Sequence, residues 1–280
     1  MPEGPEIRRA ADSIAKVIEG KLIEDVIVGL DRLAPYVSQL KGQRVREVET
    51  RGKAMLIHFN NGLSVYSHNQ LYGVWKTAKR GTLPKTKRSL RLALHTETES
   101  ALLYSASDIE VHPFEALCEH PFLKRIGPDI LDKNVQWQDI KLRLQDRRFI
   151  NRTLSALYLD QHFIAGIGNY LRSEILFAAR VHPDLKPKLL NDSQLDLLAK
   201  QTLIIGQRAY KTRGHTVPDD IRRHLAKNKT NYEGARFMVF NRESQPCREC
   251  VNPILKAQRN GRRIYWCENC QSINSEQRKK

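Results

Sequence analysis

The spacing of apolar residues near the start of the chain predicts an amphipathic helix from residue 5 to about residue 19. The apolar positions that recur at i, i+3, i+4 and i+7 are Ile7, Ala10, Ala11, Ile14, Val17 and Ile18. Pro5 suits the first helical position, where its missing N–H leaves no hydrogen bond unmade, and Gly20 provides an end. We therefore expect a first helix that buries one face.

From residue 21 to about 112 the pattern changes to short apolar runs of the β type. These runs cover residues 23–28, 45–48, 54–59, 63–66, 89–94 and 101–104. Asn61-Gly62 lies between two of them and is typical of a two-residue hairpin turn. Many short strands separated by turn residues predict a β-sandwich or barrel-like domain.

Helical periodicity replaces the strand pattern after Gly127-Pro128-Asp129. Helices are expected at 134–145, 149–162, 168–180 and 192–209, and the polar, basic stretch 211–235 is interpreted as a long mobile loop. The chain thus predicts a multidomain α+β fold in three parts. These are a β-sandwich with an N-terminal helix over 1–126, a helical domain over 127–235, and a small cysteine module over 236–275.

Four of the five cysteines lie in that last module, with the spacing Cys247-x2-Cys250-x16-Cys267-x2-Cys270. Two CxxC pairs at such a separation are typical of a structural zinc site, in which four thiolates surround one ion. A module of about 40 residues buries too little surface to fold alone, so a Zn²⁺ ion is expected to stabilise it. The alternative is four reduced cysteines without a metal.

Two further segments offer contacts to an anion. Asn260-Gly261 predicts a hairpin turn that carries Arg262 at its tip, although a solvated basic turn is equally consistent with the pattern. Gly166-Ile167-Gly168 precedes a helix whose free N–H groups, together with the Asn169 side chain, suit a phosphate. Glycines that only allow close helix packing are the alternative for this second segment.

Positive charge distinguishes this chain from an average globular protein. It has 47 Lys and Arg against 31 Asp and Glu, a formal net charge of +16 and a pI near 9.8. Such an excess favours a polyanionic partner, first of all nucleic acid, with a ribosome-associated or simply basic protein as the alternative. No window approaches the roughly 18 apolar residues of a membrane span, and the first residues do not resemble a signal peptide. We expect no membrane partner and a reducing, cytoplasmic location.

The most unusual chemistry is expected at Pro2. Removal of Met1 would expose it as a free secondary amine, and an α-amino group titrates near ~8, well below the ~10.4 of lysine. Attack of a secondary amine on a sugar carbon forms an iminium ion, which is an electron sink, and Glu3 beside it is suited to proton transfer. The alternative is that Pro-Glu-Gly-Pro-Glu only starts the helix.

Five motifs together resemble one family, the formamidopyrimidine and endonuclease VIII DNA glycosylases. They are Met1-Pro2-Glu3-Gly4-Pro5-Glu6, Arg51-Gly52-Lys53, Gly127-Pro128-Asp129, Gly168-Asn169-Tyr170, and the four cysteines with Arg262 before Cys267. They extend from residue 2 to residue 270. Within the family, Gln70-Leu71-Tyr72 on a single loop resembles the endonuclease VIII branch.

The resemblance implies a bifunctional DNA glycosylase and AP lyase of base excision repair. Such an enzyme excises oxidised pyrimidines through a Schiff base at the N-terminal proline and nicks the strand by β,δ-elimination. The implied fold is a catalytic β-sandwich, a helix-two-turns-helix domain and a zinc-finger hairpin. The implied partner is double-stranded DNA with damaged bases or abasic sites, bound by a monomer in the bacterial cytosol.

The resemblance also implies roles for individual residues. The catalytic residues would be Pro2, Glu3, Lys53 and Arg262. Gln70, Leu71 and Tyr72 would fill the space left by an everted nucleotide, and Arg125 and Asn169, with Arg262, would bind phosphate. One structural Zn²⁺ would be held by Cys247, Cys250, Cys267 and Cys270. An ordinary exposed strand-end lysine is the alternative for Lys53.

Two alternative functions remain open from the sequence. One is a formamidopyrimidine-type glycosylase for oxidised purines, and the other is a non-catalytic, zinc-containing DNA-binding protein. The stretch 211–235 bears on the first, because it is longer than the endonuclease VIII branch leads us to expect. In the sister branch, a loop of this region folds over the damaged base.

Overall fold

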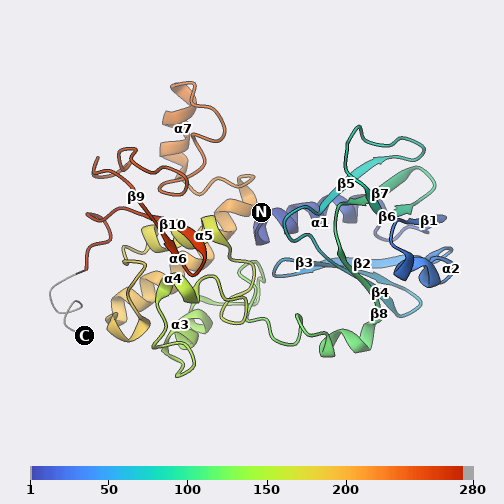
Figure 1. The fold of residues 1–280 in the computed structure, drawn as a ribbon, viewed down its shortest axis with the longest axis horizontal. Helices are drawn as coiled ribbons and strands as arrows, with labels where there is room; N and C mark the ends of the chain where they lie inside the picture. The colour runs from blue at the N-terminus through green and yellow to red at the C-terminus, as the bar shows by residue number, and fades with distance from the viewer. Residues whose placement is uncertain (1, 274–280) are drawn as a thin grey trace. The chain divides into compact units, whose positions relative to one another are not determined.

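The structure, a computed structural model, describes residues 2–273 (Figure 1). The chain divides into two compact units, of which the first ends at Arg125 and the second begins at Ile126. The predicted removal of Met1 and the end of the predicted 236–275 module lie outside the described residues. Within residues 2–273, no helix combines the length and apolar composition required to cross a bilayer.

The first unit is a β-sandwich with a helix packed into it. Its strands form two antiparallel four-stranded sheets, in the orders β2-β3-β4-β8 and β1-β6-β7-β5. Its elements are α1 (Gly4–Ile18), β1 (Asp25–Val28), η1 (Asp31–Tyr36), α2 (Val37–Leu40), β2 (Val45–Arg51), β3 (Ala54–Phe59), β4 (Leu63–His68), β5 (Val74–Lys79), β6 (Leu90–His95), β7 (Glu99–Tyr104), β8 (Asp108–Pro113) and η2 (Phe114–Glu119). The predicted sandwich is confirmed.

One apolar core holds this unit together. The buried face of α1, with Ile7, Ile14 and Ile18, packs against apolar side chains of both sheets, such as Phe59 and Leu94. The expected first helix and the six expected strands are present, with ends shifted by a few residues. The prediction missed β5, in which Lys76, Thr77 and Lys79 leave only short apolar runs, and β8, in which apolar residues alternate with Asp, Glu and His.

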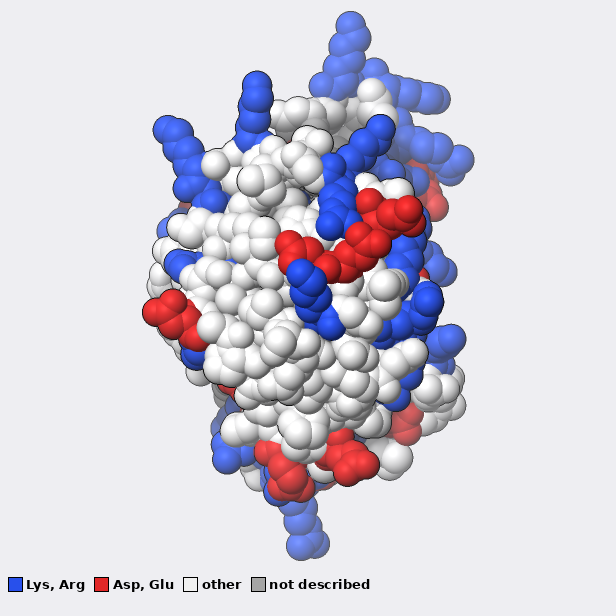
Figure 2. All heavy atoms as spheres, turned by 90° about the vertical axis from the view of Figure 1, so that its right-hand side faces the viewer, with Lys and Arg blue, Asp and Glu red and all other residues white. Residues whose placement is uncertain are grey.

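The surface charge of the first unit is uneven. Figure 2 looks onto the side on which β1 and α2 are labelled in Figure 1. A broad region to the left of the middle of this face and below it is uncharged, Lys and Arg side chains project around the margin, and acidic residues gather in small groups, one of them close to the middle beside basic side chains. This face therefore does not present the continuous positive surface that duplex DNA requires.

The second unit is helical and carries a two-stranded hairpin. Its elements are α3 (Trp137–Gln145), α4 (Leu154–Leu157), α5 (Asn169–Ala178), η3 (Pro187–Leu189), α6 (Asp192–Lys211), α7 (Asp219–Lys227), β9 (Leu255–Arg259) and β10 (Arg262–Trp266). Helix α5 packs against α6 and β10, and its Leu171 and Ile175 belong to the same buried core as Ile140 of α3 and Leu198 of α6. The predicted cysteine module lies within this unit, because Ile264 of β10 belongs to the same core.

Two predictions for the second unit are wrong. The helix expected over 149–162 is reduced to the four residues of α4, since Asp160 accepts the N–H of His162 at 2.9 Å and forms a local turn. The loop expected over 211–235 contains α7. Most residues of α7 are charged or polar and none is buried, although Ile221 packs against a small apolar cluster, so its short apolar pattern was easily taken for part of a polar loop.

Candidate active site and metal centre

Pro2 and Glu3 lie directly before the rigid first helix. Glu3 is the N-cap residue of α1, and its carbonyl accepts the N–H groups of Glu6 and Ile7 at 3.0 Å. Its own N–H donates to Oε2 of Glu6 at 3.0 Å. Glu3 is 3% exposed and lies at the positive end of the helix dipole, whereas Pro2 is half-buried. The backbone that carries the candidate nucleophile is thus fixed by α1.

Lys53 lies in the turn between β2 and β3. Gly52 and Lys53 connect the paired residues Arg51 and Ala54, and Gly52 has φ of 62°. A two-residue hairpin turn often needs a positive φ at its first position, which glycine adopts without strain. Ala54 is in turn the partner of His68 on β4, so Lys53 lies at the end of the sheet where β4 finishes.

The segment after β4 forms a tight loop that presents two exposed apolar side chains. Gln70 has φ of 46°, and its N–H donates to Nδ1 of His68 at 3.1 Å. Its side-chain Nε2 lies 3.4 Å from Oδ2 of Asp108. Leu71 and Tyr72 are 55% and 67% exposed, although both are large and apolar or aromatic. The loop is held at its start while its tip remains available to a partner.

Glycine is required where this loop closes. The N–H of Gly73 donates to the Asn69 carbonyl at 2.7 Å. A Cβ at position 73 would lie 2.7 Å from Cα and 2.8 Å from O of Asn69, which are backbone atoms that cannot move aside. The close approach that shapes the loop therefore excludes any other residue.

His68 was not predicted as a site residue, but it connects the Lys53 turn to this loop. Burial lowers its pKa, the positive charge of Lys53 lowers the pKa further, and Asp108 acts in the opposite direction. The ring is therefore neutral near pH 7. Because Nδ1 accepts the N–H of Gln70, the proton of the neutral ring is on Nε2. Nothing in the sequence marks His68 except its place beside the Gln70 motif.

In the second unit, Asn169 is the first residue of α5, and the buried Arg172 orients its side chain. Arg172 is 0% exposed and donates to Oδ1 of Asn169 at 2.7 Å, to the Ser155 carbonyl at 2.8 Å and to the Arg263 carbonyl at 2.8 Å. A guanidinium group has only donors, so the amide oxygen of Asn169 must face it. The amide nitrogen of Asn169 consequently points away from Arg172 and can donate to an anion.

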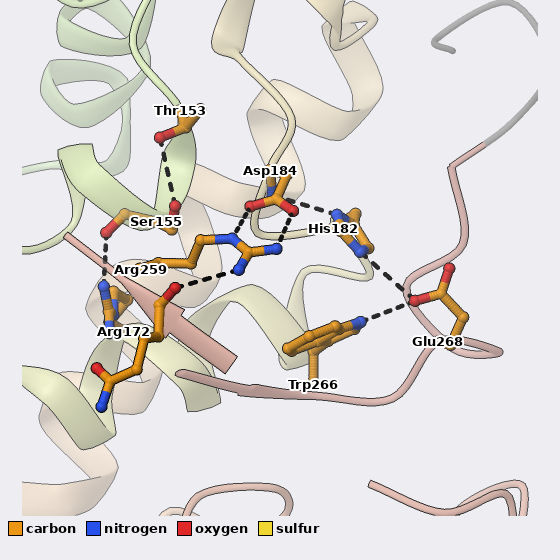
Figure 3. Close-up of polar contacts among 9 residues, drawn as sticks. Thr153, Ser155, Arg172, His182, Asp184, Arg259, Trp266 and Glu268 are labelled. Carbon is orange, nitrogen blue, oxygen red and sulfur yellow. Dashed lines mark hydrogen bonds and ion pairs between the residues drawn. The ribbon is translucent and has the colours of Figure 1, made fainter. Parts of the chain in front are cut away.

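Arg172 also links α5 to the hairpin that carries Arg262. Arg262 begins β10 and is exposed, next to the Arg263 carbonyl that Arg172 holds. Figure 3 shows Arg172 with its bond to Ser155. The buried Arg172 thus holds Asn169 directly and holds the backbone beside Arg262 through the Arg263 carbonyl. Arg125 is exposed at the end of the first unit.

Glu174 fixes the segment that leads into the cysteine module. Its buried carboxylate accepts the N–H groups of Met238, Val239 and Phe240, each at 2.8 Å, and the hydroxyl of Thr216. Sequence reasoning missed both Arg172 and Glu174. The signal was available, because Arg172 and Glu174 are the two charged residues of a mostly apolar helix over residues 169–178.

The four predicted cysteine ligands lie together. The Sγ atoms of Cys247 and Cys270 are 3.9 Å apart, those of Cys250 and Cys267 are 3.4 Å apart, and all four lie within 4.8 Å of one another. Cys247 and Cys267 are buried. This arrangement gives a group of four sulfur ligands that is able to bind a metal ion.

A model of the N-terminal domain of formamidopyrimidine-DNA glycosylase matches residues 1–107, and a model of the helix-two-turns-helix domain of the same enzymes matches residues 126–220. The chain belongs to this family. The curated relatives include two proteins named endonuclease 8. The one from Salmonella arizonae and the one from Escherichia coli are each 49% identical over 271 residues, covering 97% of this chain and all of theirs.

Solved structures show the same fold. A Lactococcus lactis formamidopyrimidine-DNA glycosylase in complex with DNA that contains N7-benzyl-Fapy-dG aligns with a TM-score of 0.81 at 21% identity. A complex of that glycosylase with abasic-site DNA aligns with a TM-score of 0.80. Both alignments cover 97% of this chain and 100% of the other. The predicted family, its endonuclease VIII branch and the predicted fold class are confirmed.

The family membership also confirms the activity expected from the sequence. The chain is a bifunctional DNA glycosylase and AP lyase of base excision repair. Its two candidate sets of residues divide between the units. Lys53, His68 and the Gln70 loop lie at one end of a sheet in the first unit, and Asn169 and Arg262 lie on α5 and the hairpin of the second.

Proposed function

We propose that this glycosylase excises oxidised pyrimidines from double-stranded DNA by attack of the Pro2 nitrogen on C1′ of the damaged nucleotide. The observation that carries the proposal is the fixed position of Pro2, directly before the buried Glu3 and α1. The high identity to proteins named endonuclease 8 supports a pyrimidine preference.

In this mechanism the C1′–N bond of the damaged base breaks as the Pro2 nitrogen bonds to C1′, and Glu3 supplies the proton that opens the sugar. The resulting iminium ion acidifies the C2′ proton. Loss of that proton expels the 3′ phosphate by β-elimination, and a second elimination expels the 5′ phosphate. Lys53 contacts phosphate and assists proton transfer, and water then releases the sugar fragment from Pro2.

Gln70, Leu71 and Tyr72 occupy the space in the duplex that the everted nucleotide leaves. Their exposure, on a loop held by His68 and Asp108, supports this role, because apolar side chains inserted between bases offset part of the unstacking cost. Asn169, Arg262 and Arg125 bind the phosphates. The outward-facing amide nitrogen of Asn169 supports its part in this.

The four cysteines hold one structural Zn²⁺ ion. A tetrahedral site with Zn–S bonds of ~2.3 Å has sulfur–sulfur separations of about 3.8 Å. The separations of 3.4 Å and 3.9 Å fit that size. The ion would stabilise the base of the hairpin that carries Arg262, while the reaction itself takes place at Pro2.

We place the enzyme, as a monomer, in the bacterial cytosol, where its DNA substrate is found. The relatives named endonuclease 8 come from Salmonella and Escherichia, which supports a bacterial repair enzyme.

A preference for oxidised purines is the second candidate function. It is favoured by the length of the stretch 211–235, which contains the helix α7, since a loop of this region folds over the damaged base in the sister branch.

Borohydride trapping tests the mechanism. Incubation with duplex DNA that contains an oxidised pyrimidine or 8-oxoguanine, in the presence of borohydride, should give a covalent adduct, faster with the pyrimidine. Pro2→Gly should abolish strand cleavage while DNA binding remains, since binding relies on other residues. Protein that keeps Met1 by mass spectrometry should behave in the same way, because its Pro2 nitrogen is an amide. Full cleavage by such protein would refute the iminium step, and faster excision of the purine would favour the second candidate.

A further inference from the structure

We propose that Arg259 and Asp184 form a clamp that aims the hairpin tip and thereby positions Arg262 on the DNA backbone. The proposal rests on the phosphate-binding role of Arg262 given above. It concerns a pair of residues that contact no DNA themselves. Both are therefore positioning residues.

The two arginines that flank the hairpin turn have different surroundings. Asn260 and Gly261 form the turn with φ of 55° and 70°, so Arg259 and Arg262 are directly opposite each other on β9 and β10. Like charges at paired positions of two antiparallel strands repel each other. An arrangement that keeps both side chains free at the tip would therefore be unfavourable.

Arg259 is withdrawn from the tip by a bidentate ion pair. Its Nε donates to Oδ1 of Asp184 and its second terminal nitrogen donates to Oδ2, both at 2.9 Å. A third bond, at 3.1 Å, goes to the carbonyl of Gln258. Figure 3 shows the guanidinium group facing the Asp184 carboxylate. Such a fork-to-fork pair fixes orientation as well as distance, because the guanidinium group is planar.

Asp184 is itself held in place. It belongs to the loop after α5, and its backbone N–H donates to Nδ1 of His182 at 3.2 Å. The ring of His182 packs edge-on against Trp266 of β10, with centroids 5.7 Å apart, and the Trp266 indole donates to Glu268 at 2.8 Å. The clamp thus joins the tip end of β9 to a loop that already packs against β10.

Arg262 has no comparable attachment. It is exposed, and within residues 2–273 its side chain makes no hydrogen bond or ion pair. A two-stranded hairpin is marginally stable by itself, so its tip direction depends on what its strands are anchored to. On β10 the anchors are the buried Ile264 and the Arg263 carbonyl held by Arg172, and on β9 the anchor at the tip is Arg259.

The clamp and simple electrostatics predict opposite changes in DNA affinity when the charge of Asp184 is removed. Asp184→Asn removes a negative charge near the DNA-binding hairpin, and charge alone would then strengthen binding to a polyanion. If Asp184 instead aims the hairpin, the same substitution releases Arg259 opposite Arg262 and weakens binding. The direction of the change therefore separates the two explanations.

The experiment measures the Kd of the full-length, zinc-loaded protein for a duplex that carries a stable abasic-site analogue, at several salt concentrations. Asp184→Asn and Arg259→Gln should each weaken binding about as much as Arg262→Ala. Each should also lower the slope of log K against log salt by about 0.9, the value for one phosphate contact. Adding Asp184→Asn to Arg262→Ala should cause no further loss. Asp192→Asn is the matched control, since it makes the same charge change at an ion pair with Lys141 on α3.

Unchanged or tighter binding by Asp184→Asn, additive losses in the double variant, or no effect of Arg262→Ala would each overturn the clamp. Zinc content and the melting temperature show whether a variant is folded, and Arg259→Gln provides a second test if Asp184→Asn is not. Because these readouts need no chemistry, a missing borohydride adduct would refute the lyase mechanism of Pro2 without altering the result for the clamp.

Discussion

Replacing Glu174 should detach the cysteine module from α5. Its carboxylate, on a side chain that is 2% exposed, accepts three backbone N–H groups of residues 238–240, each at 2.8 Å. In Glu174→Ala these donors lose their acceptor in a mostly buried place, at a cost of about 1–3 kcal/mol each. The sum of about 3–9 kcal/mol is comparable with the whole stability of a domain, about 5–15 kcal/mol. We expect this variant to lose the hairpin, and with it Arg262-dependent DNA binding.

Glu174→Gln should remove fewer of these hydrogen bonds than Glu174→Ala. Oε1 of the carboxylate receives Val239 and Phe240, while Oε2 receives Met238 and the Thr216 hydroxyl. An amide that keeps its oxygen at the Oε1 position places an NH₂ group against the N–H of Met238, so one backbone donor is lost. The expected cost is about 1–3 kcal/mol. The free energy of unfolding should therefore decrease from wild type to Gln to Ala.

Urea unfolding followed by circular dichroism measures this order, and hydrogen exchange at residues 238–240 locates the effect. Glu233→Gln is the control, because that carboxylate is 70% exposed in its ion pair with Arg236 and should change stability by less than about 0.5 kcal/mol. If the Ala and Gln variants were equally stable and within about 1 kcal/mol of wild type, the three hydrogen bonds would not support the module as argued.

Three further outcomes are expected. Replacing Gln70, Leu71 and Tyr72 together with alanine should slow base excision from duplex DNA much more than cleavage at a pre-formed abasic site; equal losses on both substrates would contradict a gap-filling role. Chelation should remove one zinc per chain and unfold the hairpin module, given metal binding worth roughly 10–16 kcal/mol in comparable sites, and active enzyme without zinc would refute this. Because the pKa of His68 lies below its ordinary value, its contribution to stability is present above pH ~6.5 and is lost as the pH falls through its folded pKa. The stability and duplex excision of the wild type should then fall more steeply with acidification than those of His68→Gln. Parallel pH profiles of the two proteins would show that protonation of the His68 ring is not the cause.

The first unit was largely predictable because its elements obey simple periodicities. Ile7, Ile14 and Ile18 line one face of a helix, and strands such as β3 are apolar at nearly every position. β8 was missed because the strand lies at a sheet edge and alternates Ile109 and Val111 with Asp, Glu and His. A short alternating strand and a polar loop look alike until the pairing partner is known.

The second unit was harder, because long-range hydrogen bonds decide its local structure. The N–H of Leu154 donates to the Leu185 carbonyl and that of Ser155 to the Pro183 carbonyl, both at 2.8 Å, so α4 is placed by a segment about 30 residues away. Helix α7 shows the converse problem. No residue of α7 is buried and Ile221 packs against one apolar cluster, so local features such as Asp219 and Asp220 in the first turn contribute much of its stability, and these do not change the hydrophobic pattern.

For the site residues, the sequence indicated which residue is involved but not how its side chain is oriented. A motif identified Asn169 as a phosphate-binding candidate, but an asparagine amide has both a donor and an acceptor, and only the donor suits a phosphate. The choice is made by Arg172, which binds Oδ1 at 2.7 Å and is itself held by the carbonyls of Ser155 and Arg263. Because one of these carbonyls belongs to the hairpin, a displaced hairpin would also release Arg172 from one of its partners. The orientation of Asn169 and the position of Arg262 are therefore coupled through one buried side chain, although the two residues lie 93 positions apart in the chain.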